Sequence, residues 1–263
     1  MDCNKWRVIV DETPHSALEQ MAVDRALAEE AIPTVRFFCW DSPAVSLGWK
    51  QPHPEWLASR AWLAAGCERV ERPTGGGLAF HGSDLSISIT VPRAEPMSLH
   101  ALMDAVCGSA VALCRSYGAD AYSPSDALNG RRIAYCLTET SPYAARIGAQ
   151  KVAGFALRRF PRSWLVQGSL LVRPISDTLA RALPPELLDS LRDRAVALSE
   201  TATERVDEPA AAHRWAASWF AWWAEPLGRN SWGPRSTVDN PHRGSVDCRL
   251  WTVDCGLTSS NAV

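Results

Sequence analysis

The sequence predicts an α+β fold, a mixed β-sheet flanked by helices. Two observations support this: segments in which apolar and polar residues alternate are grouped at 6–91 and 144–172, and amphipathic helical patterns lie among and after them. A chain of 263 residues that is 46% hydrophobic can bury one full core. We therefore expect one catalytic-size domain, residues 1–227, and an irregular or partly disordered tail, residues 228–263.

The first part of the chain is predicted to form a strand, a helix and two paired strands. Trp6 to Asp11 alternates as a strand does, and Pro14-His15-Ser16 opens a helix from Ala17 to Glu30 that should pack on the sheet. Residues 34–40 and 44–48 follow as a strand pair joined by a turn at 41–43. The apolar stripe of the helix consists of Leu18, Met21, Ala22, Ala26 and Leu27.

The middle of the chain adds two helices and two strands. Pro54 to Ala65 is a short helix that ends at Gly66, because proline favours the first turn and glycine the end. Two strands, 78–80 and 85–91, surround a turn at 81–84. Ser98 then caps a long amphipathic helix that extends to Tyr117.

Residues 123–143 are rich in turn-forming residues and predict a long loop that covers a site or moves. Beyond it we expect strands at 144–147, 151–157 and 164–172, and helices at 175–191 and 208–223. The last helix carries tryptophans at helical spacing, which predicts a buried face rather than an aromatic ligand cage. These are Trp215, Trp219, Trp222 and Trp223.

A run of three glycines, Gly75 to Gly77, precedes an apolar alternation and is the first candidate for a site. Glycine lets a backbone approach a ligand or another backbone without a Cβ in the way. The run is neither a Walker loop nor a dinucleotide fingerprint, because the required Gly-Lys-Ser/Thr and Gly-x-Gly-x-x-Gly orders are absent. It is consistent with a pocket wall and also with a simple glycine-rich hairpin.

Lys151 is the second candidate. The sequence contains three lysines among 27 basic residues, so arginine supplies nearly all of the positive charge. Lysine provides a compact, mobile ammonium that arginine cannot reproduce. Retention of a lysine at this position indicates a specific use of its amine, although a surface lysine kept by chance would look the same.

Composition argues against several functional classes. A formal net charge of −2 offers no basic footprint for nucleic acid, and no apolar run is long enough to span a bilayer. The first residues show no secretion signal, so we expect a cytoplasmic protein that binds neither nucleic acid nor membrane. The eight cysteines form no CxxC pair, and His242, Cys248 and Cys255 match no zinc spacing, so no metal site is predicted.

Five blocks of the sequence, in this order, resemble those of one family, the lipoate–protein ligases and octanoyltransferases, which are related in fold to biotin protein ligases. The resemblance spans residues 6–174. The blocks are Leu18 to Leu27, Val35-Arg36-Phe37 with Pro43 to Gln51, Arg72 to His81, Gln150 to Gly154, and Gln167 to Val172.

The resemblance implies a biotin/lipoate-ligase-like catalytic domain and assigns roles to residues. In the family the glycine run lines an acyl tunnel, and the lysine of the fourth block, here Lys151, points at the acyl carbonyl or the acyl-adenylate. In one octanoyltransferase branch a cysteine upstream of that lysine is the nucleophile, and Cys136 stands in the corresponding place. The acyl- or adenylate-binding residues implied are Arg72, Thr74, Gly75, Gly76, Gly77, His81 and Gly154.

Two chemistries remain open. A transferase would take octanoyl or lipoyl from a carrier thioester, hold it on Cys136 and pass it to a lysine of a lipoyl-type carrier domain, with Lys151 stabilising the oxyanion. An ATP-dependent ligase would form lipoyl-adenylate with ATP and Mg, and Lys151 and Arg72 would neutralise its phosphate. Gly77 and Glu71 pull against the transferase. The transferase branch typically has arginine at the third glycine, where Gly77 looks more like the ligases. Glu71 stands where the family commonly has an arginine.

The spacing of Cys136 and Lys151 favours the transferase, which we expect. Its partners would be an apo lipoyl-domain protein as acceptor and acyl carrier protein as a candidate donor, with no covalently bound cofactor. A non-catalytic acyl-binding subunit is the third alternative, and the presence of Lys151 argues against it.

Overall fold

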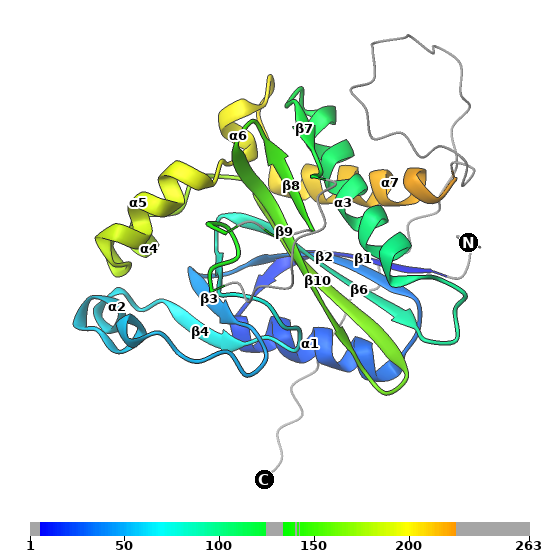
Figure 1. Cartoon of the computed structure of the whole chain (residues 1–263), viewed down its shortest axis with the longest axis horizontal. Coiled ribbons are helices and arrows are strands. Elements are labelled where there is room, and N and C mark those ends of the chain that lie inside the picture. The colour runs from blue at the N-terminus through cyan, green and yellow to red at the C-terminus, as the bar shows by residue number, and fades with distance from the viewer. Residues whose placement is uncertain (1–5, 125–133, 140, 142, 225–263) are drawn as a thin grey trace.

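The computed structural model describes residues 6–124, 134–139, 141 and 143–224. Two sheets form the framework: seven strands in the order β1-β2-β6-β10-β9-β8-β7, and three in the order β4-β3-β5. Figure 1 shows α1 along one face of the larger sheet and α3 and α7 on the other. Mixed sheets with flanking helices confirm the predicted α+β class.

The larger sheet contains one parallel pair, β1 with β2, and its other neighbours are antiparallel. Its apolar residues make the main core against α3 and α7; Val35, Phe37, Leu85, Ile87 and Val166 are among them. In sheet order the strands are β1 (Arg7–His15), β2 (Thr34–Trp40), β6 (Asp84–Pro92), β10 (Ser163–Leu171), β9 (Gln150–Arg159), β8 (Ala144–Ile147) and β7 (Ala121–Tyr122).

The smaller sheet corrects one predicted pairing. Its strands are β3 (Ala44–Leu47), β4 (Glu68–Glu71) and β5 (Ala79–His81). The strands at 34–40 and 44–48 exist but do not pair, because β1 and β6 occupy both edges of β2 while β3 pairs with β4 and β5. The turn at 81–84 likewise joins strands of different sheets. Both turns therefore carry the chain from one sheet to the other.

Helix α1 (Ala17–Glu30) begins at a capping box, in which the Ser16 hydroxyl accepts from the Glu19 amide and the Glu19 carboxylate accepts from the Ser16 amide. The predicted stripe is confirmed at Met21 and Leu27 and is wrong at Leu18, Ala22 and Ala26, which are exposed. The buried face also includes Gln20 and Asp24. These two polar side chains bind the buried Arg36 on β2, so polar contacts as well as apolar area hold this face of α1 against the sheet.

Two helices predicted as continuous are broken. Residues 54–65 form a 3₁₀ turn, Glu55–Ala58, and helix α2, Arg60–Ala65, which Ser59 caps. Residues 175–191 divide into α4 (Asp177–Ala182) and α5 (Pro185–Arg194), because Pro184 and Pro185 cannot continue a helix. A short helix, α6 (Leu198–Thr201), was not predicted.

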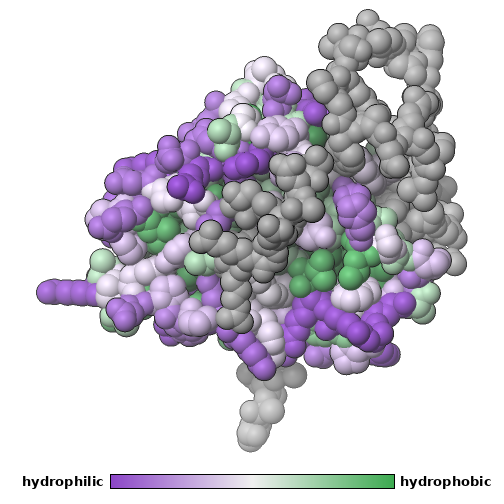
Figure 2. All heavy atoms as spheres, viewed as in Figure 1, coloured by the Kyte–Doolittle hydropathy of each residue, from purple (hydrophilic) through white to green (hydrophobic). Residues whose placement is uncertain are grey.

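Helices α3 (Leu99–Ser116) and α7 (Glu208–Ala224) pack on each other and on the larger sheet. Trp215 and Trp219 are fully buried, which confirms the predicted tryptophan face at these two positions. The side chain of Trp223 and the predicted tail, 228–263, lie outside the described residues. Figure 2 shows that hydrophilic residues cover most of the visible face, with small hydrophobic patches between them. Among the described helices, none combines the length and apolarity needed to cross a membrane.

Candidate active site

A cavity of about 30 Å³ lies where α1, both sheets and the segment around Cys136 meet. Space of this size holds about two water molecules. Its apolar lining is Met21, Phe38, Trp40, Ala79, Ile87, Phe155 and Ala156. Its remaining lining is Ser46, Arg72, His81, Ser86, Cys136, Gly154, Gln167, Gly168 and Ser169.

Cys136 and Lys151 meet over Gly154. A Cβ on Gly154 would stand 2.7 Å from the Cys136 Sγ, 3.1 Å from the Lys151 Cε and 3.3 Å from the Lys151 Nζ. Only glycine leaves room for both side chains at this place. The structure thus brings a thiol and an amine to one point on strand β9.

Lys151 is 2% exposed, and its ammonium donates to three protein acceptors. These are the backbone carbonyl of Cys136 at 2.6 Å, the Ser141 hydroxyl at 3.0 Å and the carbonyl of Glu139 at 3.3 Å. Burial lowers the pKa of Lys151, and the charge of Arg146 lowers it further, while the negative charge of Cys136 opposes both. The lysine therefore binds the backbone of the cysteine residue as well as lying beside its sulfur.

The Cys136 segment is attached to the glycine run. The Leu78 amide donates to the Ala134 carbonyl, and the Cys136 amide donates to the Leu78 carbonyl, each at 2.8 Å. On its other side the Glu139 carboxylate accepts from the amides of Ala134 at 2.8 Å and Tyr135 at 3.0 Å. Four hydrogen bonds, each donated by a backbone amide, therefore hold the segment that carries the thiol.

The glycine run folds around the guanidinium of Arg72. One terminal nitrogen of Arg72 donates to the carbonyls of Gly75 at 2.7 Å and Gly77 at 2.6 Å. Gly76 has φ +87°, and its backbone approaches Gly48 so closely that a Cβ on Gly48 would lie 2.1 Å from the Gly76 oxygen. The close approach predicted for the glycines is therefore to a second backbone and to an arginine.

Arg72 has nearly all its donors engaged. Its other terminal nitrogen donates to the Ser46 carbonyl at 2.9 Å and the Ser46 hydroxyl at 3.2 Å. Burial lowers the pKa of Arg72, and the negative charge of Cys136 raises it. A guanidinium has five N–H donors, so four protein acceptors leave little for a bound phosphate.

Thr74 belongs to a second buried network. Its amide and hydroxyl donate to the Gln167 side-chain oxygen at 3.2 and 2.7 Å, and Gln167 donates to Asp24 at 2.6 Å. Asp24 also binds Arg36 at 3.0 Å, and Arg36 binds Asp11 at 2.8 Å. This chain of polar contacts joins α1 and the larger sheet to the start of the glycine run.

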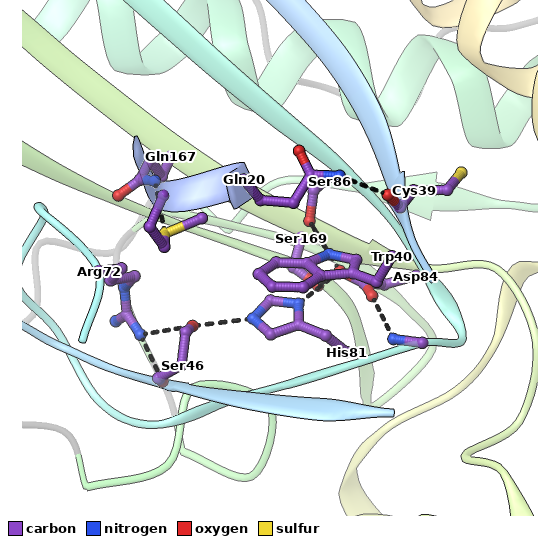
Figure 3. A network of polar contacts seen from close by, with 12 residues as sticks. Gln20, Cys39, Trp40, Ser46, Arg72, His81, Asp84, Ser86, Gln167 and Ser169 are labelled. Atoms are coloured by element: carbon purple, nitrogen blue, oxygen red, sulfur yellow. Dashed lines mark hydrogen bonds and ion pairs between the residues drawn. The ribbon is translucent and has the colours of Figure 1, made fainter. Parts of the chain in front are cut away.

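His81 lies within a third polar network, drawn in Figure 3. Its Nδ1 is 2.9 Å from the Asp84 carboxylate and its Nε2 is 2.8 Å from the Ser46 hydroxyl. The Trp40 ring stacks on the imidazole with centroids 3.9 Å apart. Burial raises the pKa of Asp84, but His81 and the hydroxyls of Ser169 and Ser86 together hold it below its ordinary value.

The structure brings five of the predicted residues together: Cys136, Arg72, His81 and Gly154 line the cavity, and Lys151 lies against Cys136. The cavity lining does not include Thr74 or Gly75 to Gly77. The carbonyls of Gly75 and Gly77 bind Arg72, which does line the cavity.

Sequence reasoning missed four residues that organise the site: Ser46, Asp84, Glu139 and Gln167. Sequence signals exist for two of these residues, Ser46 and Asp84. Ser46 interrupts the short apolar strand β3, and Asp84 opens β6, whose serines alternate with aliphatic residues. A polar residue within a buried strand needs a hydrogen-bond partner, and such partners cluster.

The remaining described cysteines are held in the thiol form. Burial raises the pKa of Cys39, Cys107 and Cys114 to about 12 and also raises that of Cys67. These thiols are held protonated at neutral pH, which leaves them poor nucleophiles. Among the described residues, no group of three histidine, cysteine or acidic side chains could hold a metal ion. The set His242, Cys248 and Cys255 lies outside them.

Curated proteins similar to the chain are bacterial octanoyltransferases. The octanoyltransferase LipM of Symbiobacterium thermophilum is 30% identical over 220 residues, which cover 78% of this chain and 80% of the relative. That of Carboxydothermus hydrogenoformans is 30% identical over 187 residues, 68% of this chain and 69% of the relative.

Solved structures similar to the chain are lipoate ligases. Lipoate-protein ligase A bound with ATP has a TM-score of 0.64 at 20% identity, and the match covers 82% of this chain and 86% of that one. A putative lipoate protein ligase from T. acidophilum with bound lipoic acid has a TM-score of 0.60 at 19% identity, with the same coverage. The model of the lipoyl protein ligase A/B catalytic domain matches residues 16–218. The chain therefore belongs to the lipoyl protein ligase A/B catalytic domain family.

Proposed function

We propose that this protein is an octanoyltransferase that carries the acyl group on Cys136 between a donor thioester and a lysine of a lipoyl domain. The observation that carries the proposal is the meeting of the Cys136 sulfur and the Lys151 amine over Gly154. A cation next to a thiol favours the thiolate, which is the nucleophilic form. Lys151 also acts on the Cys107 thiol, but burial raises the pKa of that thiol to about 12.

The reaction has two steps. In the first, the Cys136 thiolate attacks the carbonyl carbon of the donor thioester, and the donor's sulfur leaves as a thiolate. In the second, the neutral amine of the acceptor lysine attacks the acyl-cysteine, the Cys136 thiolate leaves, and the amide nitrogen loses a proton. Lys151 stabilises the oxyanion of both steps. Burial lowers its pKa, so its ammonium releases a proton more readily than that of an exposed lysine.

The curated relatives support transfer over ATP-dependent ligation, since those described above are octanoyltransferases. The contacts of Arg72 support the same choice. In a ligase Arg72 would bind the adenylate phosphate, but here its guanidinium is buried and donates to Ser46, Gly75 and Gly77. Releasing it for a phosphate would leave buried carbonyl groups without partners, which is unfavourable.

The donor and acceptor follow from the same proposal. An octanoyl thioester of acyl carrier protein would supply the acyl group and an apo lipoyl domain would receive it, with no tightly bound cofactor. The cavity holds about 30 Å³, too little for an eight-carbon chain, so lining side chains have to move. Met21 is suited to this because its unbranched side chain adapts readily.

The test is the mass of the protein after incubation with octanoyl carrier protein and no acceptor. Wild type should gain one octanoyl group on the Cys136 peptide and lose it on addition of an apo lipoyl domain. Cys136→Ser should lose most turnover, because a hydroxyl is a far poorer nucleophile than a thiolate. Cys67→Ser, which changes a thiol outside the cavity, serves as the control.

One result would reverse the choice of reaction. If Cys136→Ser modified the lipoyl domain at the wild-type rate with free lipoate and ATP, and released pyrophosphate, the protein would be a ligase. If neither donor led to acceptor modification by the wild type, the acyl-binding subunit would be the better description.

A further inference from the structure

Asp84 is a buried carboxylate whose charge is balanced without lysine or arginine. Among the described residues its partners are His81 at 2.9 Å, the hydroxyls of Ser86 at 2.9 Å and Ser169 at 2.6 Å, and the Gly82 amide at 3.1 Å. A carboxylate only accepts, so the His81 Nδ1 must carry a hydrogen and donate it to Asp84. Asp84 thereby fixes which nitrogen of the imidazole is protonated.

With a neutral imidazole, the hydrogens of the next two contacts then run in one direction. Arg72 can only donate, so the Ser46 hydroxyl accepts from it at 3.2 Å. The hydrogen of that hydroxyl is left for the His81 Nε2, at 2.8 Å. Arg72, Ser46, His81 and Asp84 form a relay in which every hydrogen points from the cation to the anion, and such chains strengthen each bond within them.

The cation end of this relay, Arg72, lines the same cavity as Cys136. Burial lowers the pKa of Arg72, and the negative charge of Cys136 opposes that shift. Arg72 also holds the Gly77 carbonyl, and the next residue, Leu78, is hydrogen-bonded to the Cys136 amide. Moving Arg72 would therefore disturb both the charge beside the sulfur and the backbone that carries it.

We propose that Asp84, His81 and Ser46 are positioning residues that orient Arg72, so that its guanidinium acts as a second cation on the Cys136 thiolate, beside Lys151. Trp40 keeps the imidazole in plane by stacking on it and donates to Ser86, which in turn binds Asp84. Figure 3 shows Ser46 between Arg72 and His81, with Asp84 beyond the ring. The inference rests on the octanoyl transfer proposed above, but the state of the thiol can be measured without that reaction.

The experiment measures alkylation of Cys136 by iodoacetamide against pH in the full chain, with the Cys136 peptide quantified by mass spectrometry. Ser46→Ala removes the hydroxyl but leaves the Ser46 carbonyl to Arg72, and Asp84→Asn removes the charge at nearly the same shape. We expect both variants to be alkylated more slowly at pH 7, by about threefold to tenfold, which lies within the range that one ordinary intramolecular hydrogen bond spans. Their rate–pH curves should move to higher pH, and kcat for octanoyl transfer should fall more than KM changes.

Ser109→Ala is the matched control. Ser109, like Ser46, is a buried serine with a hydrogen-bonded hydroxyl; it accepts from Trp215 at 3.0 Å, lies on α3 and does not line the cavity. It should lower stability without moving the alkylation curve. If Ser46→Ala and Asp84→Asn gave the wild-type curve, or if Ser109→Ala shifted it equally, the relay would be only a structural network.

A second arm separates positioning from direct chemistry. Cys136→Ala is incubated with octanoyl carrier protein and its peptides are searched for an ester on Ser46. No ester is expected, and acylated Ser46 would overturn the positioning role by making it a nucleophile. The two proposals fail in different measurements. Failure of the proposed function would appear as a wild type without transferase activity. Failure of the positioning role would appear as equal alkylation curves for the wild type, Ser46→Ala and Asp84→Asn.

Discussion

The ammonium of Lys151 has three hydrogens, and three protein acceptors surround it in a site that solvent barely reaches. Burial is the largest influence on its pKa and lowers it. We expect the wild type to gain stability over Lys151→Met as the pH rises from neutral towards 10.5, the ordinary value for lysine. In that window the unfolded chain binds this proton more tightly than the folded one, so deprotonation favours the folded state.

The measurement is urea unfolding of both proteins at several pH values. Both chains also carry Cys136→Ala, because Lys151 acts on the charge of that thiol; titrating groups that do not interact with Lys151 are common to the two chains and cancel in the difference between their free energies of unfolding. A difference that stayed constant up to the ordinary lysine pKa would show that Lys151 is not destabilised as a cation by burial.

Gly76 and Gly75 form a matched pair of neighbours with opposite environments. Gly76 has φ +87°, and a Cβ there would lie 3.1 Å from the Arg72 guanidinium, whereas a Cβ on Gly75 would have nothing within 4 Å. Gly76→Ala should lower the free energy of unfolding by about 1–2 kcal/mol and reduce transfer, because the left-handed backbone disfavours a side chain. Gly75→Ala should leave both nearly unchanged, as thermal melts and a transfer assay would show. Equal effects of the two substitutions would contradict the role given to the Gly76 backbone.

Several site residues were recognisable before any coordinates. Lys151 stood out because arginine supplies most of the positive charge, and the glycine run because three glycines have no ordinary use in a strand. The partners of these residues were not recognisable, because Ser46 and Asp84 acquire meaning only when two sheets place them on either side of His81. Periodicity shows which face of an element is buried but not which polar atoms meet there.

The segment around Cys136 depends on Glu139 for its shape. The Glu139 carboxylate closes the turn by accepting from the amides of Ala134 and Tyr135, and its own carbonyl accepts from Lys151. Glu139→Ala should reduce kcat for octanoyl transfer by about tenfold, since two hydrogen bonds that hold the nucleophile are lost. Glu139→Gln keeps an acceptor oxygen and should retain most activity. If both substitutions behaved alike in steady-state kinetics, the turn would be held by other contacts.

The helices and strands were predicted better than their connections. The limits of α1, α3 and β2 follow from caps and alternation within the segment itself, and the structure places them within a residue of the prediction. The pairing of β2 with β1 and β6, and of β3 with β4 and β5, depends on partners distant in sequence. The two broken helices could have been predicted from the sequence, because Pro184 and Ser59 are local signals of the breaks.

The packing of α3 on α7 offers a test far from the chemistry. A Cβ on Gly108 of α3 would lie 2.3 Å from the Trp222 ring of α7, so the two helices have no room for a methyl group. Gly108→Ala should lower the free energy of unfolding by about 1–3 kcal/mol, as overpacking does, and leave kcat near wild type. Adding Trp222→Leu should recover part of the loss in a urea titration. A fully tolerated Gly108→Ala would mean that α7 can shift without penalty.

The hydrogen bonds of Cys136 join pieces of chain that a ribosome makes at different times. Leu78 and the glycine turn emerge first, the cysteine follows, and Lys151 and Gly154 come last. Until strand β9 has been synthesised and has joined the sheet, the thiol has no ammonium beside it and behaves as an ordinary cysteine. Chains grow residue by residue over seconds, so an incomplete chain meets acyl donors before the site around Cys136 has formed. Under the proposed transfer mechanism, acylation of Cys136 therefore awaits the synthesis of strand β9.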